Sequence, residues 1–150
     1  MRRTVITLIA LTATAAVAGC GGGGGESKAD YIKRADAICL DATKQLRALG
    51  SPATPAQFQR FAAKAIPIIE AHLRQVRALH PPKDIAPKAN RVFDNVDQGI
   101  QLVRRIATAA RKSDAIALQK LASEAAVLSS KTGTDAKAVG FKECGRTTAL

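Results

Sequence analysis

Apolar residues recur at steps of three and four positions through four stretches of the chain, about 28–49, 55–79, 85–111 and from 114 onward. This spacing places them on one face of an α-helix, so each stretch is predicted to be an amphipathic helix. The first two apolar faces consist of Tyr31, Ile32, Ala35, Ile38, Cys39, Ala42 and Leu46, and of Phe58, Phe61, Ala65, Ile69, Leu73, Val76 and Leu79. The last two consist of Ile85, Ala89, Val92, Phe93, Val96, Ile100, Val103 and Ile106, and of Ile116, Leu118, Leu121, Ala125 and Leu128.

Turn and capping residues indicate where the first two helices begin and end. Gly50-Ser51-Pro52 should end the first helix, which begins near residue 28. Thr54 is a good N-cap for the second, with Pro55 at its first position and Gln57 completing a capping box. Pro67 lies inside the second helix and lacks the N–H that would bond to residue 63, so a kink or a break is expected there.

The sequence marks the boundaries of the third and fourth helices less clearly. Pro81-Pro82 separates the second helix from the third, and Asp84 is the predicted cap of the third. The fourth should start after Ser113 or Asp114. The sequence leaves two alternatives for the end of this helix. Gly133 could end it, or the helix could continue further, with Gly140 as the residue that follows its last turn.

Short connections between long amphipathic helices favour antiparallel neighbours, and therefore an up-down-up-down four-helix bundle. Composition agrees with this all-α prediction. Alanine dominates, and the aromatic residues are one Tyr and four Phe with no Trp, so the β-branched and aromatic signature of sheets is missing.

The N-terminus resembles a secretion signal. Residues 1–3 carry two arginines, and residues 4–17 form an apolar run that is too short to span a membrane. Val17-Ala18-Gly19-Cys20 resembles the bacterial lipobox, which implies cleavage before Cys20 and lipid attachment to its sulfur. The alternatives are a plain secretory signal and an N-terminal anchor helix.

These features divide the chain into four parts. Residues 1–19 are the predicted signal peptide, and residues 20–28 are the lipidated cysteine followed by a flexible tether that contains five consecutive glycines. Residues 29–145 are the predicted helical domain, and residues 146–150 are a predicted disordered tail.

The three cysteines are an odd number for a secreted protein. Lipidation of Cys20 would leave Cys39 and Cys144, which are expected to pair outside the cytoplasm. In a bundle of this topology the end of the fourth helix returns to the start of the first, which would bring Cys144 toward Cys39. The alternative is two buried free thiols; no C-x-x-C motif indicates a redox-active pair.

Several short motifs resemble those of small uncharacterised lipoproteins of high-GC Gram-positive bacteria. They are Tyr31-Ile32, Ala35-Asp36-Ala37-Ile38-Cys39, Leu79-His80-Pro81-Pro82 and Gly140-Phe141-Lys142-Glu143-Cys144-Gly145. The resemblance would cover most of the mature domain. It implies a helical domain with the two cysteines paired, and it carries no function.

The chain is strongly basic, with a formal charge of +11. Without Arg2 and Arg3 the mature chain would have 21 Lys and Arg against 12 Asp and Glu, a net charge of +9. These cations are scattered and accompanied by few aromatic residues, which disfavours specific nucleic-acid binding. Besides the membrane reached through the lipid, anionic lipid or an anionic envelope polymer is the expected partner class.

No motif indicates catalysis, a cofactor or a metal site. His72 and His80 lie eight residues apart, so they cannot share one metal on a single helix, and His72 is predicted to be packed or hydrogen-bonded. Asp94 and Asp97 could bind a cation, but a solvated helix face explains them better. Lys131-Thr132-Gly133 matches one element of penicillin-binding proteins, whose other elements are missing.

The leading functional hypothesis is a lipid-anchored protein on the extracytoplasmic face of the cell membrane, with a non-enzymatic helical interaction domain. The second hypothesis is a lipoprotein that binds a small apolar ligand between its helices near Pro67. An enzyme ranks third. A cavity of several hundred Å³ beneath Pro67 would favour the second hypothesis, and a filled core would favour the first.

Overall fold

The computed structural model describes residues 26–146, and within this range the chain forms four α-helices and no strand. They are α1 (Lys28–Ala48), α2 (Pro55–Arg77), α3 (Ala86–Arg111) and α4 (Ala115–Val139). The predicted all-α fold is therefore confirmed. The predicted signal peptide, the lipobox with Cys20, the five glycines and residues 147–150 lie outside the described residues.

Side chains cap three of the four helices at their N-terminal ends. Ser27 and Asp114 each accept a hydrogen bond from the backbone N–H three residues ahead, at the starts of α1 and α4. Thr54 and Gln57 form the predicted capping box of α2. Since Ser27 caps α1, the helical domain begins within the segment that the sequence analysis assigned to the tether.

Gly140 ends α4, which resolves the two alternatives for this helix in favour of the longer one. Its φ is 102°, in the left-handed region that favours glycine, whereas Gly133 lies within α4. The backbone turns back on itself after Gly140, because the N–H of Phe141 bonds to the carbonyl of Ala136.

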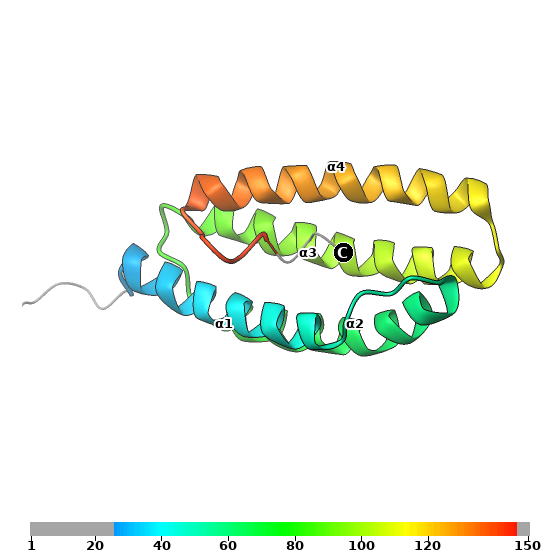
Figure 1. Ribbon diagram of the computed structural model, residues 1–150. Helices are drawn as coiled ribbons and strands as arrows, with labels where there is room; N and C mark the ends of the chain where they lie inside the picture. Colours follow the sequence, from blue (N-terminus) through cyan, green and yellow to red (C-terminus); the bar gives the residue numbers. More distant parts are fainter. Residues whose placement is uncertain (1–25, 147–150) are drawn as a thin grey trace, which may run out of the picture.

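The structure differs from the predictions made from the sequence at one point in α2 and at one point in α3. The helix α2 continues unbroken through Pro67, and Figure 1 shows it curving along its length. Asp84 is not the cap of α3, so that prediction was wrong. Ile85 occupies the cap position, and its apolar side chain makes no hydrogen bond. The carbonyl of Pro82 receives the N–H groups of Ile85 and Ala86.

Consecutive helices pack against each other along the described chain: α2 on α1, α3 on α2 and α4 on α3. Within residues 26–146, the backbones of α1 and α4 do not approach closely enough to be neighbours. Figure 1 shows the C-terminal tail, which we define as residues 141–146, running back between these two helices. The bundle is thus closed on this side by an irregular segment.

The apolar core is divided into a larger and a smaller cluster. The larger cluster joins α1, α2, α3, the end of α4 and the tail, and it includes Tyr31, Val92, Phe93, Val139 and Phe141. The smaller cluster lies only between α3 and α4, around Leu102 and Leu121. The tail therefore contributes to the core at one end of the bundle, and the core is thinner at the other end.

Candidate functional site

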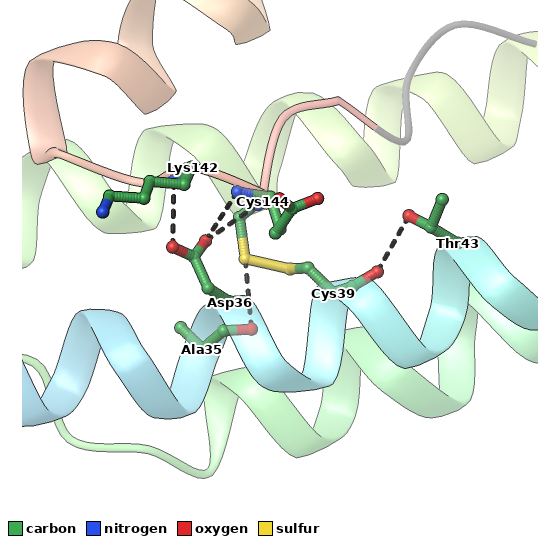
Figure 2. The surroundings of a disulfide bond; sticks show 7 residues. Ala35, Asp36, Cys39, Thr43, Lys142 and Cys144 are labelled. Atoms are coloured by element: carbon green, nitrogen blue, oxygen red, sulfur yellow. Dashed lines mark hydrogen bonds between the residues drawn. A yellow bond between two sulfur atoms is a disulfide. The ribbon is translucent and has the colours of Figure 1, made fainter.

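A disulfide between Cys39 of α1 and Cys144 of the tail is the most constrained feature of the described chain (Figure 2). The Cα atoms of the two residues are 5.2 Å apart. The predicted pairing is confirmed, and the alternative of two free thiols is excluded. Cys144 is buried, with its sulfur 3.3 Å from the carbonyl oxygen of Ala35.

Asp36 holds the tail one turn of α1 away from this disulfide. Its carboxylate accepts three backbone hydrogen bonds, from Lys142 and Glu143 at 2.9 Å each and from Cys144 at 3.0 Å. Hydrogen bonds to an ionised acceptor are stronger than neutral ones. The tail is consequently fixed to α1 by one covalent and three charge-assisted links, as Figure 2 shows for the labelled residues.

Gly145 lets the other side of the tail approach α4. A Cβ atom at this position would lie 2.5 Å from the Cβ of Ala136, and the φ of Gly145 is +92°. Both the space and the backbone conformation therefore require glycine. The tail packs against both α1 and α4 at the end of the bundle where side chains of the two helices share one apolar cluster.

His72 is buried and hydrogen-bonded, as the sequence predicted. Its Nδ1 lies 2.7 Å from the carbonyl oxygen of Ile68, and its Nε2 lies 2.9 Å from Oδ2 of Asp41 on α1. The hydrogen bond with His72, followed by one from Gln45, lowers the pKa of Asp41 below its ordinary value. This contact ties α1 to α2 and leaves neither ring nitrogen free for a metal.

The lowered pKa of Asp41 predicts a modest dependence of the fold's stability on acid pH, because the carboxylate is 60% exposed and its contact is screened by water. Because the folded-state pKa of Asp41 is lowered, its contribution is present above its ordinary pKa of about 4 and is lost as the carboxylate is protonated below it. Asp41→Asn is therefore expected to lower the urea midpoint at about pH 6 and to have little effect at about pH 2.5. An identical midpoint difference at both pH values would contradict this assignment.

The paired carboxylates of Asp94 and Asp97 form a surface ion-pair cluster with α2. One guanidinium nitrogen of Arg77 lies 2.9 Å from Asp94 and 2.7 Å from Asp97, and all three side chains are well exposed. Arg77 was not identified from the sequence, because it lies on a different helix. The cluster needs no cation or catalytic role to explain it.

The other sequence candidates are structural parts of the helices. Lys131-Thr132-Gly133 lies within α4, where the buried hydroxyl of Thr132 donates to the carbonyl of Leu128. His80 is exposed in the connection after α2. Among residues 26–146, no three His, Cys, Asp or Glu side chains converge in a way that could hold a metal ion.

Two buried polar groups were not anticipated from the sequence. Asn95 of α3 donates to Asp135 of α4 at 3.0 Å and links the two helices. Tyr31 is fully buried, and its hydroxyl has no hydrogen-bond partner in the described chain. Burial, with a smaller effect of Glu26, raises the pKa of Tyr31 to about 12, so the phenol stays neutral at physiological pH and cannot serve as a base there.

Besides a hollow of about 290 Å³ beside the α1–α2 connection, two hollows lie between α3 and its neighbours. A small apolar hollow of about 80 Å³ lies between α2, α3 and α4, among Phe58, Ile69, Val103 and Leu128. A wider and more polar one of about 430 Å³ lies between the end of α3 and the start of α4. None of the four helices combines the length and the apolar character that a bilayer-spanning segment requires.

No family model matches the chain, and comparison with curated proteins and with solved structures finds no similar protein.

Proposed function

We propose that the chain is a lipoprotein anchored through Cys20 to the extracytoplasmic face of the cell membrane, with a non-enzymatic interaction module as its helical domain. The observation that carries this proposal is the arrangement of the helix ends and connections, which divides the bundle into two distinct ends. The start of α1, the connection between α2 and α3, and the end of α4 lie at one end, here called the proximal end. The α1–α2 connection and the α3–α4 turn lie at the other, distal end (Figure 1).

The separation of the proximal end from the distal end supports presentation of the distal half to a partner. The tether would enter at the proximal end, directly before the Ser27 cap. With 25 residues, α4 is about 37 Å long at 1.5 Å per residue, so the distal end can extend well beyond a membrane surface. The wider hollow lies at the distal end, whereas the apolar one lies near the middle of the helices.

The hydroxyl groups of the domain support a non-enzymatic module. Thr43, Thr108, Ser123, Thr132 and Thr134 each donate to the carbonyl four residues earlier in their own helix. Such hydroxyls satisfy backbone carbonyls of their own helices, which is a structural role.

The size of the apolar hollow bears on the second hypothesis, a small apolar ligand between the helices. At about 80 Å³ the hollow is far smaller than the several hundred Å³ typical of ligand pockets. It is also lined by residues on either side of Pro67 rather than by Pro67 itself. The interaction module is therefore the better-supported proposal.

The anchor can be tested by replacing Cys20 with serine. The unmodified chain should partition into detergent and incorporate a labelled fatty acid, because two or more acyl chains give stable membrane attachment. Cys20→Ser should incorporate no label and should accumulate as uncleaved precursor or as a form that does not enter detergent.

Gly22→Ser is a matched control, since it changes a neighbouring residue and keeps the cysteine. It should be labelled like the unmodified chain. Equal detergent partitioning of Cys20→Ser and the unmodified chain, without label in either, would show that the apolar run of residues 4–17 holds the protein.

A further inference from the structure

The wider hollow at the distal end is lined by four basic side chains together with the apolar residues Ala109, Ala117 and Leu121. It lies between the end of α3 and the start of α4 and measures about 430 Å³. Its donor side chains are Gln101, Arg104, Arg105, Lys112 and Lys120, whereas the hydroxyl of Thr108 donates to the carbonyl of Arg104. The one acidic residue that lines it, Asp114, accepts a hydrogen bond from the N–H of Ala117 as the cap of α4. We call this hollow the basic groove.

Positive charge in the basic groove is only partly neutralised. Arg104 pairs with Glu70 of α2 at 2.6 Å, and Arg105 pairs with Glu124 of α4 at 2.8 Å. Each arginine uses one terminal nitrogen for its pair and is about half exposed, so further N–H donors of the guanidinium still face water. Lys112 and Lys120 form no ion pair within residues 26–146, so the groove keeps an excess of positive charge.

The dimensions of the groove favour an extended anion over a single small one. From Arg104 to Lys112 the rise along α3 is about 12 Å, at 1.5 Å per residue. Lys120, on the opposing helix, lines the same hollow. The groove is open to solvent, and its charges are spread over this length. This arrangement suits a polymer that carries one anion in each repeat unit. Arginine guanidinium groups and lysine ammonium groups both bind phosphate oxygens by charge and by hydrogen bonds.

Two other anionic partners fit the groove less well. Single-stranded nucleic acids are bound in grooves where aromatic side chains stack on the bases, and the basic groove has no aromatic residue. Anionic lipid would be met at the proximal end, because the tether enters there, and salt screens charges beyond about 8 Å at physiological strength. The distal position therefore favours a polymer that lies away from the bilayer.

We infer that the basic groove binds a phosphate-bearing polyanionic polymer of the cell envelope. The envelope setting rests on the proposed function, whereas the binding itself requires only the described fold. Lys112 and Lys120 supply unpaired charge, and Arg104 and Arg105 supply oriented donors.

Binding of fluorescent inorganic polyphosphate to the full chain in neutral detergent tests the inference. Lys112→Gln with Lys120→Gln removes two exposed charges from the groove. Lys83→Gln with Lys88→Gln removes two exposed charges from the proximal end and is the matched control. At low salt the groove variant should bind roughly tenfold more weakly, and the slope of log affinity against log salt should fall by about two. The control variant should change affinity by less than about twofold.

Several results would overturn the inference. Undetectable binding of polyphosphate at low salt would do so, as would equal losses in the two double variants, which would indicate diffuse attraction. Tighter binding of single-stranded DNA with the same number of phosphates would assign the groove to nucleic acid. A loss of binding to anionic vesicles confined to the groove variant would assign it to lipid.

Two further measurements separate this inference from the anchor and from misfolding. Cys20→Ser should bind polyphosphate as the unmodified chain does, so failure of the anchor and failure of the groove give different results. Both double variants should keep the helical circular dichroism and the melting temperature of the unmodified chain, because the replaced side chains are exposed.

Discussion

A variant in which Cys39 and Cys144 are both alanine is expected to lose roughly 2–5 kcal/mol of unfolding free energy. The disulfide closes a loop with a sequence separation of 105, so its removal frees a long segment in the unfolded chain. It also removes the covalent link between α1 and the tail. Since small domains are stable by only about 5–15 kcal/mol, the effect is a large part of the total. Urea denaturation of the variant and of the unmodified chain measures it.

The same variant should lose stability first in α1. Within the described chain, the backbone of α1 packs closely on α2 but not on α4, so the tail is its main link to α4. Hydrogen exchange should therefore show weakened protection in α1, while the pair α3 and α4 keeps most of its protection. Reduction of the unmodified chain should reproduce the pattern, and Cys20→Ala serves as the control that removes a cysteine outside the disulfide. Uniform loss of protection in all four helices would refute this local account.

Replacing Asp36 by alanine is expected to cost roughly 3 kcal/mol, because three backbone N–H groups lose their acceptor at once. Glu143 and Cys144 are partly or fully buried, so water cannot freely replace the carboxylate. Asp36→Asn keeps the shape and one oxygen but turns an NH₂ group toward the same donors, so it should cost about 2 kcal/mol.

Asp94→Ala is the matched control for Asp36. Its carboxylate makes an exposed pair with Arg77, which is expected to contribute at most about 1 kcal/mol. Asp36→Ala should also be non-additive with loss of the disulfide, because both links fix the same tail to the same helix. Equal costs for Asp36→Ala and Asp94→Ala would show that the three hydrogen bonds contribute no more than a surface ion pair.

Local signals in the sequence determined the helices. Apolar spacing of three and four residues, the Thr54–Gln57 capping box and Gly140 all act within a few residues of where they stand, so their effects could be predicted without a fold. The predicted Asp84 cap is the exception, and this prediction was wrong for a local reason. The carbonyl of Pro82 receives the N–H of Ala86, which a capping Asp84 side chain would have received, and Pro87 has no N–H to offer.

The candidate site was only partly predictable. The pairing of Cys39 and Cys144 followed from the cysteine count and the expected topology. Nothing distinguished Asp36 from the other acidic residues on helix surfaces, because its partners are backbone groups 106 to 108 positions away. The Asp41–His72 contact and the basic groove likewise join residues of different helices, and backbone spacing along one helix contains no information about them.

The sequence by itself determined that four helices form, where most of them end, and that two cysteines are available to pair. Only the tertiary structure decided that α1 and α4 stay apart and that residues 141–146 fill the space between them. The reason is steric and electrostatic. Gly145 permits contact with Ala136, and Asp36 supplies the acceptor for the tail's N–H groups. These conditions are met only when all three segments are already in place.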